Sequence, residues 1–194
     1  MQSNSAASLP ALPLDFGDAP DSATFPTLAN NGARHVITGN TLFLQGDSRC
    51  GVRRTIVGRC DGRWSDEDGI VVSGSLLLGT PVSVTVTASV PGSAVINGWV
   101  DFNGNGNWDD PGEHVFVDVA ILNGANVLSI TAPGSSVASP IARFRLTETA
   151  GYSYFGLAPN GEVEGRNSPV TSPPPTDYRN PTPRQWPNQP PPKQ

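Results

Sequence analysis

A run of strictly alternating apolar and small polar side chains constrains the fold of this chain more than any other feature. Val82, Val84, Val86 and Ala88 are separated by single Ser or Thr residues. Successive side chains of a β-strand point to opposite faces, so the run predicts a strand with one buried and one solvated face. Similar short runs follow roughly every ten residues with Pro-Gly or Asn-Gly turns between them, and none has a helical period. The sequence therefore predicts an all-β fold, a β-sandwich of the immunoglobulin-like or jelly-roll-like kind.

The two ends of the chain differ in composition from its middle. Residues 1–13 lack apolar periodicity, and residues 166–194 consist mainly of Pro with polar and charged residues. We therefore expect a disordered leader over 1–13. Because Pro cannot donate to a sheet ladder, we expect an extended Pro-rich tail or linker over 166–194. Residues 14–165 remain for one sandwich domain, which is long enough to enclose one core.

Charge, hydropathy and motif content argue against several functional classes. The formal net charge is −5 and the isoelectric point about 4.8, so no nucleic-acid partner is expected. No stretch approaches the roughly 18 apolar residues that indicate a transmembrane helix, so no membrane span is expected. The chain has no nucleophile elbow, zinc-protease helix or phosphate-binding loop, and we do not expect it to be an enzyme.

Residues 101–113, DFNGNGNWDDPGE, place oxygen-bearing side chains at alternate positions with Gly between them. Calcium takes six to eight oxygen ligands, and a short loop of this register can wrap them around one ion. The candidate ligands are Asp101, Asn103, Asn105, Asn107, Asp109 and Glu113. The last acid comes one place later than in helix–loop–helix sites and the flanks resemble strands, so we expect a calcium loop between two β-strands, with a dissociation constant of about 10⁻⁴–10⁻³ M. The alternative is an Asn/Gly-rich hairpin turn that binds no ion.

Acidic residues in two other stretches could form a second cation site. Asp15, Asp18 and Asp21 lie at every third position of one stretch, and Asp66 and Asp68 lie in another. Like charges this close repel unless something positive lies between them. A second metal site is one interpretation, and an acidic loop held by Arg or by backbone N–H groups is the other.

The only two cysteines, Cys50 and Cys60, lie ten residues apart. Their spacing is not that of a redox pair, and no His pair accompanies them as in a zinc site. We expect a disulfide that closes a small hairpin, which places the protein in an oxidising compartment. Millimolar calcium outside the cell could also fill a weak loop, so we expect a secreted or cell-surface protein.

Aromatic and basic residues near the end of the domain suggest two further features. Tyr152, Tyr154 and Trp64 are candidate stacking residues of a carbohydrate-binding module, in which the partner is a polysaccharide. Arg143 and Arg145 alternate with apolar residues in a predicted strand, and we expect them on a solvated sheet face.

Several blocks stand in one order along the chain: LDFGDAPDS, NGARHVI, SDEDG, WVDFNGNGNWDDPGE, ARFRLT and GLAPNGEVE. This succession, over about residues 14–164, resembles the GEVED domain, a family found in large secreted and surface proteins of bacteria. The resemblance implies a calcium-associated, extracellular, β-rich module without known catalysis. The motif after which this family is named begins here as GEVE, residues 161–164. It is followed by Gly165, where the family has Asp, and the usual closing strand does not follow.

Together these observations predict a non-catalytic structural or adhesion module of a secreted or surface protein, stabilised by calcium. Its partners would be other extracellular or surface proteins. A second copy could supply the missing strand, so that the protein forms a homo-polymer or filament. A carbohydrate-binding module of a secreted bacterial protein is the alternative.

Overall fold

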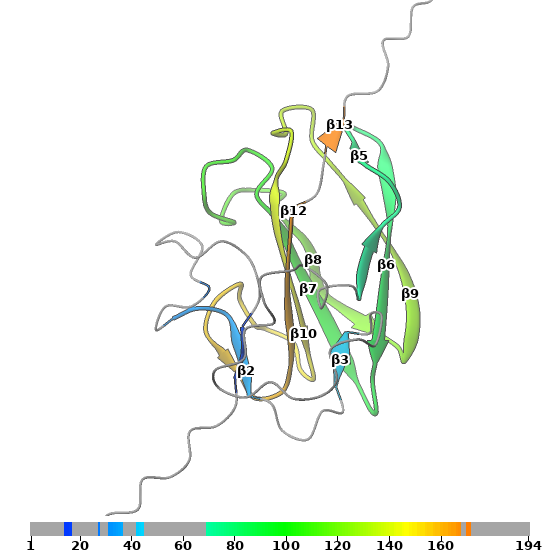
Figure 1. Ribbon diagram of the computed structural model, residues 1–194, viewed down its shortest axis with the longest axis vertical. Helices are drawn as coiled ribbons and strands as arrows, with labels where there is room; N and C mark the ends of the chain where they lie inside the picture. Colours follow the sequence, from blue (N-terminus) through cyan, green and yellow to red (C-terminus); the bar gives the residue numbers. More distant parts are fainter. Residues whose placement is uncertain are drawn as a thin grey trace, which may run out of the picture.

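The computed structural model describes residues 14–16, 27, 31–36, 42–44, 69–167 and 170–171. These residues form β-strands joined by turns and contain no helix, so the predicted all-β fold is confirmed. Most of the strands belong to two antiparallel sheets packed face to face, as expected for a β-sandwich (Figure 1). The described residues include no helix long and apolar enough to cross a membrane.

The first sheet has the order β12-β10-β7-β8 and carries the loops of functional interest. Its strands are β7 (Ala94–Val100), β8 (His114–Ile121), β10 (Ile141–Thr147) and β12 (Gly161–Asn167). All three pairings are antiparallel, and β10 pairs with β7 and β12 over nearly its whole length.

The second sheet is built around the strand that the alternating pattern predicts. This strand is β6 (Pro81–Ser89), and its Val and Ala positions are buried while all of its Ser and Thr positions are exposed or half-buried. It pairs over most of its length with β9 (Gly124–Thr131), and its other partners are β3 (Phe43–Leu44) and β4 (Ile70–Val72).

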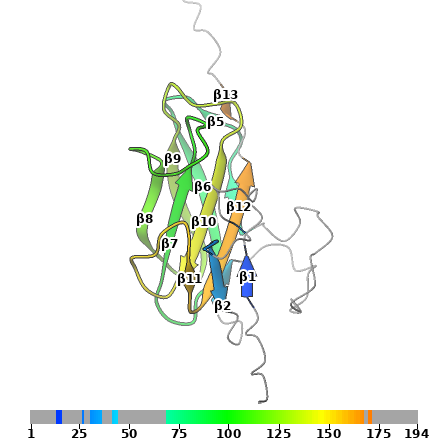
Figure 2. The same ribbon diagram turned by 90° about the vertical axis from the view of Figure 1, so that its left-hand side faces the viewer.

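A small third sheet covers the outer face of the first one. It contains β1 (Leu14–Phe16), β2 (Arg34–Val36) and β11 (Leu157–Ala158) in the order β1-β2-β11. Figures 1 and 2 show β2 beside the sheet of β10 and β12, on the side away from β6 and β9. At one end of the sandwich, β5 (Leu76–Leu77) pairs in parallel with β13 (Val170–Thr171).

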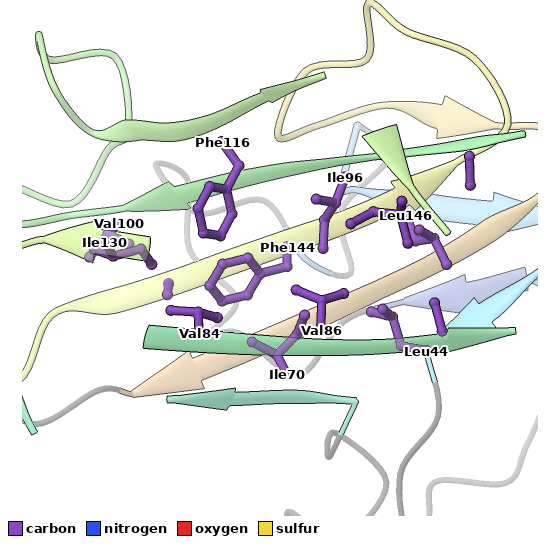
Figure 3. Close-up of a cluster of buried hydrophobic side chains, with 14 of the residues drawn as sticks. Leu44, Ile70, Val84, Val86, Ile96, Val100, Phe116, Ile130, Phe144 and Leu146 are labelled. Carbon is purple, nitrogen blue, oxygen red and sulfur yellow. The ribbon is translucent and has the colours of Figure 1, made fainter. Parts of the chain in front are cut away.

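The main core lies between the first and second sheets. Val84 and Val86 of β6 meet Ile96 of β7, Phe116 of β8 and Phe144 of β10 (Figure 3). The two phenylalanine rings lie 6.1 Å apart, and all five side chains are at most 4% exposed. Burial of each such side chain contributes about 1.5–3 kcal/mol, so this interface is the main source of stability.

The expectation that Arg143 and Arg145 face solvent is wrong. Both side chains are 0% exposed, because the small third sheet and the loop after β10 cover that face of the first sheet. Arg145 donates hydrogen bonds to the carbonyls of Ser153 (2.5 Å) and Phe155 (2.8 Å) and to Nε2 of His35 (3.2 Å). It therefore fastens the loop after β10 and the third sheet to the sandwich.

The predicted boundary at residue 165 falls inside a strand. β12 continues to Asn167, and Val170–Thr171 forms β13, so paired backbone extends into the range expected to be tail. Gly161, which begins β12, has φ 124°, and a side chain there would collide with the Leu146 carbonyl. The sequence motif led us to expect that the closing strand is missing. The backbone nevertheless continues to pair beyond residue 165.

Candidate metal centre and adjoining groove

The loop of residues 101–113 connects β7 to β8, as the strand-like flanks predict. Gly104, Gly106 and Gly112 have φ values of 71°, 89° and 91°. These left-handed conformations are strained for residues with a side chain, so the glycines allow the loop to coil tightly. A loop between two paired neighbouring strands is held at both ends by the sheet.

Asp101 is the centre of the loop's hydrogen bonding. Its side chain is only 2% exposed. Oδ1 accepts the N–H groups of Gly104 (2.7 Å) and Asn105 (3.2 Å), and Oδ2 accepts that of Gly106 (3.0 Å). Three backbone donors on one buried carboxylate fold the first half of the loop around it.

The three asparagines continue the same winding. Each side-chain oxygen accepts the N–H group two residues later, at 2.9 Å for Asn103, 3.1 Å for Asn105 and 2.8 Å for Asn107. An amide oxygen has two lone pairs, so each retains one for a further partner. These asparagine turns fix the backbone of the loop.

The two adjacent acids of the loop point in different directions. Asp110 Oδ2 accepts hydrogen bonds from the side-chain amides of Asn103 (2.9 Å) and Asn105 (2.5 Å). Asp109, one of the predicted calcium ligands, instead accepts the hydroxyl hydrogen of Tyr154 at Oδ1 (3.0 Å). The sequence pattern did not predict Asp110 as a ligand, because the alternation of oxygen-bearing side chains falls on Asp109.

Glu113 closes the loop and carries its least satisfied group. The side chain is 3% exposed; Oε1 accepts a long hydrogen bond from the Asn103 N–H group (3.4 Å), and Oε2 has no hydrogen-bond partner among the described residues. Burial raises the pKa of this carboxyl above its ordinary 4.5, and the carboxylates of Asp101 and Asp110 raise the pKa further. Asp101 and Asp110 therefore each repel Glu113 across the loop.

The donor set of the loop suits a calcium ion, which prefers carboxylate, amide and main-chain oxygens. A buried carboxylate oxygen without a donor is the kind of group that a cation would satisfy. Among the described residues, no group of three or more His, Cys, Asp or Glu side chains is gathered closely enough to hold a metal. The remaining ligands would have to come from asparagine and main-chain oxygens.

The other predicted sites lie outside the described residues. Asp18, Asp21, Asp66 and Asp68 of the second acidic site belong to this part of the chain, and Asp15 lies in β1 without a described side chain. The same holds for the two cysteines of the predicted disulfide, Cys50 and Cys60, and for Trp64. These predictions stay predictions.

A groove of about 410 Å³ adjoins the loop on the outer face of the first sheet. It lies between the 101–113 loop and the loop after β10, and its lining includes Asp109, Asp110, His114, Asp118, Tyr152 and Tyr154. Neither Lys nor Arg is among the described residues that line it.

The aromatic rings of the groove contact one another at steep angles. Tyr154 meets Trp99 edge-on at 6.1 Å and Trp108 at 5.4 Å, with interplanar angles of 76° and 64°. His114 stacks on Trp99 at 4.6 Å and 16°. The two indole rings are at most 3% exposed, so the rings form a wall of the groove rather than a flat, open platform.

A bulge in β8 shapes the floor of the groove. Ile96 and Gly98 pair with Val119 and Phe116, so the residues between them on β8 outnumber those on β7 by one. Asp118, in this bulge, has φ 47° and is the only non-glycine residue with positive φ in the described part of the chain. Left-handed backbone at a residue with a side chain stores strain that the surrounding contacts must offset.

Asn97 supplies those contacts. It is 1% exposed, its amide donates to Asp118 Oδ1 (2.7 Å), and its oxygen accepts the Asp118 N–H group (3.0 Å). His114 Nε2 also lies 2.9 Å from the Asn97 oxygen, and the Gly151 N–H group donates to Asp118 Oδ1 (3.0 Å). These hydrogen bonds, from Asn97 first and then Gly151, lower the pKa of Asp118. The sequence signal for this arrangement was a polar Asn inside an apolar strand.

The glutamates of the GEVE motif have structural contacts. Glu162 Oε2 accepts the N–H group of Leu44 (2.5 Å), and Glu164 Oε1 accepts that of Gly69 (2.9 Å). These two backbone positions flank the stretch 45–68. The motif therefore ties Leu44 and Gly69 to the first sheet.

In a comparison with protein families, residues 95–165 match the model of the GEVED domain. The matched range begins in β7, contains the 101–113 loop and ends in β12 at the motif. The resemblance read from the sequence is confirmed over this range. Neither the curated proteins nor the solved structures contain a significant match to the chain.

Proposed function

Starting from a chain with a GEVED domain over residues 95–165, we propose that the protein is a non-catalytic structural or adhesion module that calcium stabilises outside the cell. The ion would be held by the 101–113 loop, with the Glu113 carboxylate as a charged ligand and asparagine and main-chain oxygens of the loop as further ligands. Partners would be other secreted or surface proteins, which such a rigid module would display or connect.

The observation that carries this proposal is the state of Glu113. No donor among the described residues reaches its buried Oε2 atom, and burial first, then the charges of two further carboxylates, raise its pKa. Leaving a buried polar atom unsatisfied costs about 1–3 kcal/mol. A divalent cation among these oxygens would remove that cost and the repulsion together.

Calcium would act on stability by linkage. An ion that binds the folded loop and not the unfolded chain stabilises the fold by RT ln(1 + [L]/Kd), about 1.4 kcal/mol at ten times Kd. Because the loop joins β7 to β8, stabilising it also secures an edge of the first sheet. Rigidity would thus depend on extracellular calcium.

Thermal unfolding of the full chain in millimolar calcium and in chelator tests the proposal. Chelator should lower the melting temperature of the wild type by several degrees, since 1 kcal/mol corresponds to about 2–4 °C for a chain of this size. Asp101→Ala should abolish the difference between the two conditions, whatever its effect on absolute stability. Glu148→Gln, which changes an exposed acid outside the loop, is the matched control and should retain the difference. A wild-type protein with equal melting temperatures in both conditions would remove the calcium proposal.

Self-assembly is a second proposal, and the edge strand β9 supports it. Within the described residues β9 pairs only with β6, and its sequence GANVLSIT contains no charged residue and no Pro. Edges usually carry such residues because they discourage pairing between molecules. A strand from another copy could therefore add here. Light scattering after size exclusion tests this route, and a monomer at every concentration would discard it.

A further inference from the structure

The groove beside the loop combines carboxylates with aromatic walls. Asp109, Asp110 and Asp118 supply the charge, and Tyr152, Tyr154 and His114 supply rings. The hydroxyl of Tyr154 engages one oxygen of Asp109, and Asn97 and Gly151 engage one oxygen of Asp118. The second oxygen of each carboxylate makes no hydrogen bond within the described part of the chain. The groove is therefore acidic, partly apolar and preorganised.

This chemistry fits a Pro-rich segment that carries Arg or Lys. A polyproline helix has a fixed backbone, so binding in an aromatic-lined groove orders little additional chain. Guanidinium and ammonium groups form charge-assisted hydrogen bonds with carboxylates and also favour aromatic faces. A flat sugar-binding platform would need open, coplanar rings, whereas Tyr154 meets Trp99 at 76°.

The chain itself contains such a segment. Residues 172–194 follow β13 and are rich in Pro, and they carry Arg179, Arg184 and Lys193 against the single acid Asp177. Arg179 and Arg184 flank the sequence NPTP. In polyproline geometry this segment would extend about 70 Å, at roughly 3.1 Å per residue. A domain of this size is only about 40 Å across, so the segment can reach a groove on its own chain or on a neighbour.

We propose that the groove lined by Asp109, Asp118 and Tyr152 binds the Pro-rich segment 172–194, with Arg179 or Arg184 at its carboxylates. The interaction requires the groove and the segment but not a bound calcium ion. It differs from strand addition at β9, because it uses side chains on a sheet face rather than an open strand edge. Binding within one chain would cover the groove, and binding between chains would link copies head to tail.

Zero-length carbodiimide cross-linking of the full chain tests the contact. Lys193 is the only lysine, so each substitution adds one new side-chain amine, whose cross-links mass spectrometry separates from those of Lys193. Arg184→Lys places an amine within the segment, and Ser93→Lys places one in an exposed turn as a matched control. Mass spectrometry then identifies the carboxylates joined to each amine, in calcium and in chelator.

The Arg184→Lys amine should join to Asp109, Asp110 or Asp118, and the Ser93→Lys amine should not. Asp118→Asn, which removes one charge and keeps the shape, should reduce the remaining groove cross-links by about two- to fivefold, the range for a partly exposed ion pair. Pro181→Gly with Pro183→Gly should reduce them as well, and these changes lie outside the sandwich. Mixing labelled and unlabelled protein distinguishes binding within a chain from binding between chains, and either result supports the proposal.

Cross-links from the Arg184→Lys amine that spread evenly over exposed acids would overturn the proposal. So would groove cross-links that are unchanged in both the Asp118→Asn and the double Pro→Gly variants. A polysaccharide that binds the groove while the segment gives no groove cross-links would assign the site to carbohydrate instead. Because the pattern is expected in calcium and in chelator alike, its failure is distinguishable from a failure of the calcium proposal.

Discussion

Replacing Glu113 by Gln should stabilise the calcium-free protein and destabilise the calcium-bound one. The side chain is 3% exposed, and its Oε2 atom has no hydrogen-bond partner in the part of the chain that the structure describes. In chelator, the substitution removes a buried negative charge that Asp101 and Asp110 repel. In calcium, the same substitution removes a charged ligand. The change in stability therefore has opposite signs in chelator and in calcium, and both changes come from the Glu113 carboxylate.

The magnitude follows from the burial of that atom. An unsatisfied buried acceptor costs about 1–3 kcal/mol, and Gln relieves only the charged part, so we expect a gain of about 1 kcal/mol in chelator. This gain corresponds to a rise of about 2–4 °C in melting temperature. In calcium at ten times Kd, the variant should lack the wild-type stabilisation of about 1.4 kcal/mol.

The pH dependence in chelator gives the same prediction a second readout. Folding raises the pKa of Glu113 above 4.5, so the folded state holds the proton more tightly than the unfolded chain. Stability should therefore fall as the pH rises from about 4.5 through the raised pKa, and remain lower above it. Glu113→Gln should remove this fall.

Urea unfolding of wild type and variant, each in calcium and in chelator, measures all four free energies. Asp110→Asn is a useful companion, because Asp110 is partly exposed and already has two amide donors. A Glu113→Gln variant that is less stable than wild type in chelator would show that the buried charge of Glu113 does not destabilise the calcium-free loop. A variant that keeps the full calcium response would refute the role of Glu113 as a ligand.

Three further predictions concern the fold. Gly161→Ala should lower the unfolding free energy by about 3 kcal/mol in urea, because φ is 124° and the added methyl group meets the Leu146 carbonyl; Gly92→Ala, in open space, is its control and should change little. Arg145→Met should cost about 2–4 kcal/mol in the same assay and increase proteolysis of the loop after β10, because the carbonyls of Ser153 and Phe155 lose their donor. Burial, and secondarily the charge of Arg145, lowers the pKa of His35 from 6.5 to about 3, so stability should decline as the pH falls through this window. His35→Gln should flatten that decline, and an unchanged slope would contradict the assignment.

Periodicity predicted the strands that border the main core but not the third layer. The alternation around Val84 and Val86 depends only on local pleating, and the structure buries those positions as expected. Arg143 and Arg145 lie in a strand with the same alternation, yet both are buried. Their cover comes from β1, β2 and β11, which are distant in sequence, and local periodicity contains no information about such a layer.

The candidate site was predictable to the extent that its geometry is local. The loop from Asp101 to Glu113 was found because its oxygens and glycines follow one another in a short register. Asp110 was missed because adjacent acids of a turn can exchange roles when one of them meets Tyr154, a residue from another loop. The pair of Asn97 and Asp118 depends on a bulge between two strands, which only cross-strand pairing reveals.

Isothermal titration of the calcium-stripped full chain with calcium measures whether the folded protein binds the ion. We expect saturable binding of at least one ion per chain with a dissociation constant of about 10⁻⁴–10⁻³ M, typical of extracellular calcium modules. Asp101→Ala should abolish the binding by this loop, and Glu148→Gln should leave it intact. A wild-type chain that binds no calcium at millimolar concentration, or an Asp101→Ala variant that binds as the wild type does, would contradict the account.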